Sequence, residues 1–237
     1  MALKKGSIIS LGEQRVLIVA PHPDDEVLGC GGLISKIKEN EGEVHVLVMT
    51  VGDTRQYGGR SVAKIRLMEL KEAMKYLRID DFNVALKGDS HLKLDTLPQR
   101  TLIDEVETGK VSIASVDPTI VCIPYLYSTN QDHVAVSTAA FTACRPVGSP
   151  IKGTPPIVLS YEQPELVWSR RRFQPNFFID ISGHLDRKIR ALGIYRTQMR
   201  KSKHPRSIDV VKRMAETRGT EVGADAAEAY ECHRFLT

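Results

Sequence analysis

The residues best suited to chemistry stand together at positions 22–26, in the order His-Pro-Asp-Asp-Glu. Adjacent carboxylates make one another harder to ionise unless a cation or a proton lies among them. His22 and Asp25 would supply one nitrogen and one oxygen ligand across a tight turn, a donor set that suits Zn²⁺, and would leave Asp24 beside the metal as a base. The simpler alternative is that the three acids only cap a helix, where they satisfy free N–H groups.

A zinc site of this kind needs one more ligand, and His133 is the best candidate among the seven histidines. It follows an apolar run at 119–124 and a polar loop, and it begins a predicted helix. If this run is an inner strand next to the strand that precedes His22, both loops leave the sheet at the same edge. Asp132 could orient a metal ligand or cap the helix. His91, in a loop, could also lie near the site.

Short apolar runs alternate with longer amphipathic stretches through the first two thirds of the chain. Strands are predicted at 15–20, 44–50, 82–86, 120–124 and 157–160, and helices at 27–39, 61–77, 97–108 and 133–144. This alternation implies an α/β fold, a Rossmann-like three-layer α/β/α sandwich with a mostly parallel sheet. The His22 loop then lies at the carboxyl end of an inner strand, where open α/β sheets place their chemistry.

The last third of the chain is less regular. A further strand is predicted at 177–181, followed by helices at 182–195, 209–218 and 224–235. No internal repeat, low-complexity tract or clear boundary divides the sequence. Residues 1–237 are therefore predicted to form a single domain, whose C-terminal third, from about residue 150, carries the extra strand and helices. Within the earlier helix at 61–77, Ile65 and Met68 are predicted to share one broad face with Ala73 and Leu77.

The composition is that of one globular domain with a sizeable core, because the 237 residues are 42% hydrophobic and 26% charged. The formal net charge of +4 is too weak to favour a nucleic-acid partner. No apolar run approaches the ~20 residues of a membrane span, and no apolar segment follows the N-terminal lysines as in a secretory signal. The four cysteines form no C-x-x-C pair, so a reducing, cytoplasmic location is expected.

A nucleotide-binding module without hydrolase activity is the alternative from another class, because glycines follow the first strand. Gly29, Gly31 and Gly32 lack the G-x-G-x-x-G spacing and lie within the predicted helix instead of before it. Three carboxylates would also place negative charge where a pyrophosphate must bind. Close packing of the helix against the sheet explains these glycines better.

The stretch at 16–32 resembles the signature of the LmbE/PIG-L-like zinc-dependent N-deacetylases, a strand followed by (A/P)-H-P-D-D-E and a glycine-rich continuation. A later H-x-D-H-type segment of this family aligns with residues 130–133, where Asn130 replaces the first histidine. Arg66 and Glu69 match an R-x-x-E of the family, and Asp89 matches an acidic residue. Weaker similarity continues to about residue 235.

The resemblance implies one Zn²⁺ per chain, held by His22, Asp25 and His133. It implies that Asp24 is the base that takes the proton from water. In relatives, the histidine at the position of Asn130 helps to stabilise the oxyanion or to protonate the leaving amine. Asn130 can donate a hydrogen bond to an oxyanion but cannot shuttle a proton, so Asp24 is expected to handle both proton transfers.

The implied substrate is an N-acetylated amino sugar, small or within an oligosaccharide, such as an N-acetylglucosamine-containing glycan, conjugate or biosynthetic intermediate. Arg66 and Asp89 would bind its hydroxyl groups, and the products would be acetate and a free amine. An amidase of the same fold that cleaves a larger acyl group, and a metal-binding but inactive scaffold, are alternatives. Trp168 and the arginines at 170–172 indicate a solvated basic loop, a contact in a homo-oligomer, or a surface for sugar stacking.

Overall fold

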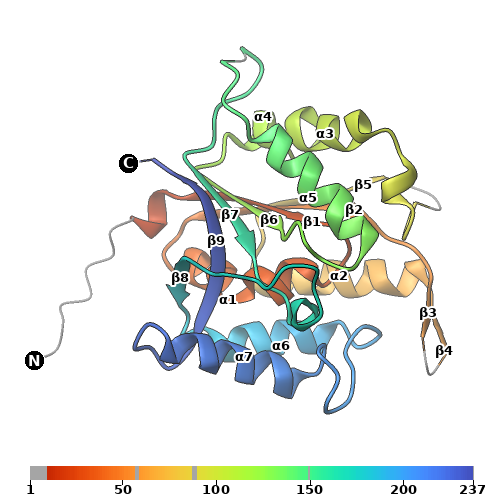
Figure 1. Ribbon diagram of the computed structural model, residues 1–237, viewed down its shortest axis with the longest axis vertical. Coiled ribbons are helices and arrows are strands. Elements are labelled where there is room, and N and C mark those ends of the chain that lie inside the picture. The colour runs from red at the N-terminus through yellow and green to blue at the C-terminus, as the bar shows by residue number, and fades with distance from the viewer. Residues whose placement is uncertain (1–9, 57–58, 87–89, 149, 237) are drawn as a thin grey trace, which may run out of the picture.

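A seven-stranded sheet forms the centre of the protein in the computed structural model, which describes residues 10–56, 59–86, 90–148 and 150–236 (Figure 1). The strand order is β5-β2-β1-β6-β7-β9-β8. Strands β5, β2, β1, β6 and β7 pair in parallel, whereas β9 is antiparallel to both β7 and β8. The bounds are Arg15–Ala20 for β1, Glu43–Thr50 for β2, Asp81–Leu86 for β5, Ile120–Pro124 for β6, Ile157–Tyr161 for β7, Phe177–Asp180 for β8 and Ala227–Phe235 for β9.

Helices cover both faces of this sheet, which confirms the predicted three-layer α/β/α sandwich (Figure 1). One layer holds α1 (Asp25–Glu39), α2 (Ala63–Leu77), α6 (Leu185–Ile194) and α7 (Ile208–Thr220). The other layer holds α3 (Gln99–Thr108), α4 (Ile113–Val116) and α5 (Gln131–Ala143). Alternate residues of β1 enter the two cores, with Val16 and Ile18 on the α1 side and Leu17 and Val19 on the α5 side. A strand buried on both faces reads as a continuous apolar run, as β1 does from Val16 to Ala20 after the partly buried Arg15.

The strand β1 lies at the point where the order of the sheet reverses, with β2 on one side and β6 on the other. Val16 pairs with Ile120 and Ile18 with Cys122, so β1 and β6 run in parallel and in register. Both strands have the predicted bounds. The loops that follow β1 and β6 therefore emerge side by side at the carboxyl edge of the sheet, the switch point at which open α/β folds bind ligands.

The glycines of α1 allow this helix to approach its neighbours closely. A Cβ atom on Gly29 would lie 2.4 Å from the Tyr161 ring, and one on Gly32 would lie 2.5 Å from Ile181. Neither distance is compatible with a side chain, so both positions require glycine unless the neighbours move. This supports the packing role that the sequence indicated and leaves no reason to assign the glycines to phosphate binding.

The helix predicted at 224–235 is wrong, because this segment forms β9 in the interior of the sheet. Its Ala and Glu residues favour a helix locally, but tertiary contacts decide the outcome. Glu228 of β9 forms a buried ion pair with Lys188 of α6 at 2.6 Å. Its two carboxylate oxygens also accept the backbone N–H groups of Gly32 and Leu33 in α1, at 2.7 and 2.8 Å. These partners are far away in sequence and leave no local signal.

The buried face of α2 also differs from the prediction. Ala73 and Leu77 are buried as predicted, but Ile65 and Met68 are exposed, Met68 at 61%. Arg66 and Glu69 are buried in their place. Each buried polar side chain has a partner outside the helix, since Arg66 donates to the Gly52 carbonyl and Glu69 accepts two hydrogen bonds from Thr197. A short hairpin of β3 (Thr54–Gln56) and β4 (Gly59–Ser61), which was not predicted, precedes α2. Among the described residues, no helix has the length and apolar character needed to cross a membrane.

Candidate metal centre and active site

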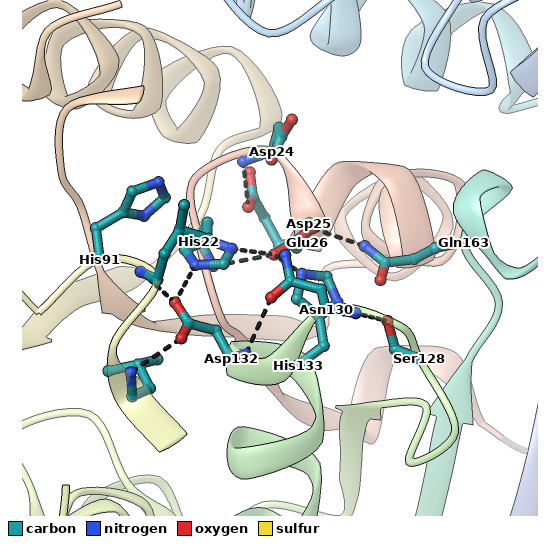
Figure 2. Close-up of polar contacts among 12 residues, drawn as sticks. His22, Asp24, Asp25, Glu26, His91, Ser128, Asn130, Asp132, His133 and Gln163 are labelled. Atoms are coloured by element: carbon teal, nitrogen blue, oxygen red, sulfur yellow. Dashed lines mark hydrogen bonds and ion pairs between the residues drawn. The ribbon is translucent and has the colours of Figure 1, made fainter. Parts of the chain in front are cut away.

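His22, Asp25 and His133 converge at the switch point between β1 and β6 (Figure 2). Their candidate ligand atoms all lie within 4.8 Å of one another, and the three residues are buried. The Oδ2 atom of Asp25 lies 3.4 Å from His22 Nδ1 and 3.2 Å from His133 Nε2. No group in the described part of the chain makes a well-aligned hydrogen bond to His133 Nε2. The trio offers two imidazole nitrogens and one carboxylate oxygen, and His133 Nε2 is not used by a hydrogen bond from the described residues. This donor set fits a zinc ion with an open fourth position.

Asp132 fixes the orientation of the His22 ring. Its Oδ2 atom lies 2.7 Å from His22 Nε2, and its two oxygens accept the backbone N–H groups of Leu92 and Leu94 at 2.7 and 2.9 Å. Although burial favours the neutral carboxyl, these contacts lower the pKa of Asp132. A carboxylate on one ring nitrogen directs the other, Nδ1, at a metal. Of the two roles that the sequence left open for Asp132, the structure supports the orientation of a ligand.

Both oxygens of Asp25 are engaged. Oδ1 accepts a hydrogen bond from Gln163 Nε2 at 2.7 Å, and Oδ2 faces the two histidines and also accepts the His22 N–H at 3.0 Å. Burial opposes ionisation, but His133 and His22 hold the pKa of Asp25 well below its ordinary value. Asp25 is therefore a carboxylate of fixed orientation, as a metal ligand must be.

Asp24 is fully buried next to this trio but is not one of its members. Its backbone has a φ of 103°, in the left-handed region that is unfavourable for an aspartate, and its N–H donates to Glu26 Oε2 at 3.1 Å. Its Oδ2 atom accepts a bond from Arg206 Nη1 at 3.2 Å, whereas Oδ1 has no hydrogen-bond partner among residues that the structure describes. Burial raises the pKa of Asp24 to about 7, against the opposing charge of Arg206. A carboxyl group with a pKa near neutrality can both accept and release a proton.

Glu26, the third acid of the triplet, has a different environment. Burial raises its pKa to about 8, and its Oε1 atom accepts a short hydrogen bond from the Tyr195 hydroxyl. At neutral pH, Glu26 is mainly protonated, so it adds little negative charge to the site. The clustered carboxylates thus avoid repulsion through a proton on Glu26 and the charges of histidine and arginine near the others.

Asn130 caps the helix that carries His133. Its Oδ1 atom accepts the Asp132 N–H at 3.0 Å, and its own N–H donates to Ser128 Oγ at 3.2 Å. The residue also lines a cavity of about 270 Å³ together with His133, Gln163, Glu165 and Arg206. Since the side-chain oxygen is used by the cap, the amide nitrogen is the group that Asn130 can offer in this cavity.

Arg66 lies inside the protein, with 2% of its surface exposed. Its Nη1 atom donates to the Gly52 carbonyl at 3.0 Å and lies 3.2 Å from His91 Nε2. The His91 ring in turn packs edge-on against His22, with 4.6 Å between ring centroids, so both residues are brought to the site. Burial and the charges of His22 and Arg66 lower the pKa of His91 to about 3. Asp89 lies outside the described residues.

Two residues of the site were not predicted from the sequence: Gln163 and Arg206. Gln163 follows β7, and its position at the carboxyl end of an inner strand is a signal that could have been used. Arg206 lies in a basic stretch, 200–206, that reads as exposed loop. Nothing in its local sequence indicates that it turns inward.

The sequence of residues 17–144 matches the family model "PIG-L: GlcNAc-PI de-N-acetylase". A diacetylchitobiose deacetylase of Thermococcus kodakarensis is 24% identical over 192 residues, which cover 78% of this chain and 70% of that protein. A probable N-acetyl-alpha-D-glucosaminyl L-malate deacetylase 2 of Bacillus cereus is 27% identical over 194 residues, covering 78% and 84%. The crystal structure of a conserved protein from Thermus thermophilus superposes with a TM-score of 0.74, at 25% identity, over 94% of this chain and 96% of that one. The family model covers more than half of the chain, which therefore belongs to the PIG-L (GlcNAc-PI de-N-acetylase) family.

Proposed function

We propose that the protein is a zinc-dependent hydrolase that removes the acetyl group from an N-acetylated amino sugar. The observation that carries this proposal is the buried trio of His22, Asp25 and His133 with a fourth acidic side chain, Asp24, beside it but outside it. A three-ligand site with a separate base is the arrangement of a catalytic zinc. Membership in the PIG-L family and the deacetylases among its relatives support the same reaction.

His22 Nδ1, Asp25 Oδ2 and His133 Nε2 would hold one Zn²⁺ per chain. When bound, zinc lowers the pKa of water towards ~7 and polarises a carbonyl group. Asp132 and Gln163 would keep the ligands in place, since they bond the second ring nitrogen of His22 and the second oxygen of Asp25.

Asp24 would act as the general base and then as the general acid. It would accept a proton from water as the water oxygen bonds to the acetyl carbon, and it would return that proton to the sugar nitrogen as the C–N bond breaks. The second proton of the water stays on the departing carboxyl group and then passes to the amine. The products are therefore acetate and the amino sugar in its ammonium form, and atoms and charge balance without a further reactant. The amide N–H group of Asn130 would donate to the developing oxyanion but would take no part in proton transfer.

For the substrate, we propose that Arg66 and Asp89 bind sugar hydroxyl groups. Arg66 lies beside His91, and Figure 2 places His91 and Gln163 on opposite sides of the metal-binding trio. The cavity that contains Asn130 and Gln163 would then hold one part of the substrate, and the Arg66 side of the site another.

Acetate release from N-acetylglucosamine and its β-1,4-linked dimer tests the proposal. The protein is assayed as isolated, after chelation and after zinc is restored, with Asp24→Asn as the matched variant. We expect zinc to restore activity in the wild type, and a loss of about 10²–10⁴-fold in Asp24→Asn at unchanged zinc content, since general-base catalysis contributes that much. A wild type that binds no zinc would contradict the proposal. Zinc binding without acetate release, but with cleavage of longer N-acyl groups, would favour the amidase alternative.

A further inference from the structure

Arg206 forms an ion pair with the proposed base, Asp24. It lies in the connection between α6 and α7, 182 residues from Asp24 in sequence, yet its Nη1 atom is 3.2 Å from Asp24 Oδ2. Its Nε atom forms a close ion pair with Glu165 Oε1. The side chain is only 19% exposed and lines the cavity that also contains His133 and Asn130.

The backbone around Arg206 is held on both sides. Its N–H donates to His204 Nδ1 at 3.0 Å, and its carbonyl accepts the N–H of Arg200 at 3.1 Å. The next residue, Ser207, caps α7 by accepting the Val210 N–H at 3.3 Å. The backbone of Arg206 is thus held in place while its guanidinium group extends inward, and Glu165 binds the Nε atom of that group. Few of its rotamers remain accessible, so the contact with Asp24 costs little further side-chain entropy.

The two oxygens of Asp24 are not equivalent. Oδ2 is taken by Arg206, whereas Oδ1 is buried without a hydrogen-bond partner among the described residues. A buried carboxylate oxygen without a donor is costly, unless a donor such as water or substrate reaches it during function. One guanidinium can hold Asp24 and Glu165 at the same time because its N–H groups form a rigid planar fork, which a lysine does not offer.

We propose that Arg206 is the positioning residue of the general base: it holds Oδ2 of Asp24, so that Oδ1 is the oxygen that takes the proton from water. The proposal rests on the proposed function and goes beyond it, because it assigns the proton transfer to one atom and gives a residue of the α6–α7 connection a role in the reaction. It also gives a function to the positive charge of Arg206, which lines the same cavity as the uncharged Asn130.

Kinetics of Arg206→Ala, Arg206→Lys and Glu165→Gln test this role, with Arg196→Ala as the control. Arg196 lies in the same connection but is exposed and pairs with Glu72 on the surface. We expect Arg206→Ala to lower kcat about a hundredfold with KM little changed, which is the effect of a misplaced catalytic group. The kcat of Arg206→Lys should lie between those of Arg206→Ala and the wild type. Glu165→Gln should lower kcat less than Arg206→Ala does, and Arg196→Ala should match the wild type. Guanidinium chloride, below the concentrations that unfold the protein, should partly restore kcat in Arg206→Ala.

Several results would overturn the proposal. A rise in KM at constant kcat would make Arg206 a substrate-binding residue, and wild-type kinetics in Arg206→Ala would make it a bystander. Loss of zinc from Arg206→Ala would assign it to the metal centre instead. If Arg206→Ala does not fold, Arg206→Gln replaces it, since an amide fills part of the space without the charge.

Crystal structures of the zinc-loaded wild type and Arg206→Ala give a readout that does not depend on activity. We expect the Asp24 carboxylate to rotate or to occupy several orientations in the variant. An unchanged Asp24 orientation would refute the positioning role. If the wild type releases no acetate, the proposed function fails on its own, and the crystallographic comparison still decides whether Arg206 orients Asp24.

Discussion

Two clusters of buried polar side chains lie along α1, one at its first turn and one at its middle. In the middle cluster, Glu228 accepts four hydrogen bonds, from Lys188, Tyr230 and two N–H groups of α1. Lys188 also donates to the Leu28 carbonyl at 2.8 Å. At the first turn, by contrast, Asp24 Oδ1 and His133 Nε2 have no hydrogen-bond partner in the part of the chain that the structure describes.

This difference distinguishes a polar cluster that stabilises the fold from one that can bind a ligand. The charged groups of the middle cluster are engaged with one another and with the backbone, so the cluster can stabilise the packing of α1 against α6 and β9 but has nothing to offer a ligand. The first-turn cluster keeps two atoms without hydrogen bonds from the described residues, and one backbone residue at a φ of 103°. Strain and unsatisfied groups persist where function requires them. A buried polar cluster is thus a candidate site when it is incomplete, and a structural element when it is complete.

The largest effect on stability is expected in the middle cluster, from Lys188→Met. The change leaves the Glu228 carboxylate buried without its counter-ion, which costs about 3–5 kcal/mol of unfolding free energy. Denaturant unfolding measures this loss, and Arg190→Met, at an exposed position of the same helix, is the control. Zinc binding by the folded fraction should not change. A loss below about 1 kcal/mol, the value of a surface pair, would remove the distinction between the clusters.

A change at the first turn should instead affect metal affinity, and Asp132→Asn tests this. The new amide would face His22 Nε2 with its nitrogen or with an oxygen that is a poorer acceptor, so the ring is no longer held in the tautomer that leaves Nδ1 free for a metal. We expect zinc affinity to fall about 10–100-fold in competition with a chelator. The stability of the zinc-free protein should fall much less than in Lys188→Met. Asp95→Asn, at an exposed position of the 3-10 helix Leu94–Thr96, serves as control, and equal zinc affinities in the two variants would contradict the assignment.

The smallest effect concerns Glu26, whose carboxyl group has a pKa of about 8 in the folded protein, against 4.5 ordinarily. Between these two pH values the native state binds more protons than the unfolded state, so the unfolding free energy falls as pH rises, by at most about 1.4 kcal/mol per pH unit. Glu26→Gln has no such group, so this part of the slope should disappear. Denaturant unfolding of both zinc-free proteins across this range measures the difference. If the unfolding free energies of the two proteins change in parallel with pH, Glu26 is ionised in the folded protein.

The sequence was sufficient for the parts of the site that depend on short-range pattern. The apolar run of β1 and the motif that follows it predict a strand, a loop and a helix start at or near the acidic triplet, because each of these features is local. The position of His133 next to His22 required one further assumption, that β6 lies beside β1, and the pairing confirms it. The roles proposed for Asn130, Arg66 and Asp89 remain predictions.

The remainder of the fold and of the site depends on contacts that no local pattern encodes. The segment of β9 is rich in Ala and Glu and favours a helix, and it becomes a strand only because β7 and β8 flank it. Gln163 and Arg206 reach the site from connections far along the chain. On α2, the polar residues Arg66 and Glu69 are buried beside the apolar ones, because Arg66 reaches the Gly52 carbonyl and Glu69 accepts two hydrogen bonds from Thr197.

The place of β9 between β7 and β8 also sets an order of events during synthesis. The N–H groups of Gly32 and Leu33 find their partner in Glu228, which is translated 196 and 195 residues later. At about 5–20 residues per second, α1 leaves the ribosome roughly 10–40 s before this carboxylate exists. From the synthesis of β7 until that of β9, the edge of β7 that pairs with β9 is open, and Lys188, once made, has no counter-ion. The nascent chain is therefore most exposed to aggregation, and most in need of a chaperone, just before its last strand enters the sheet.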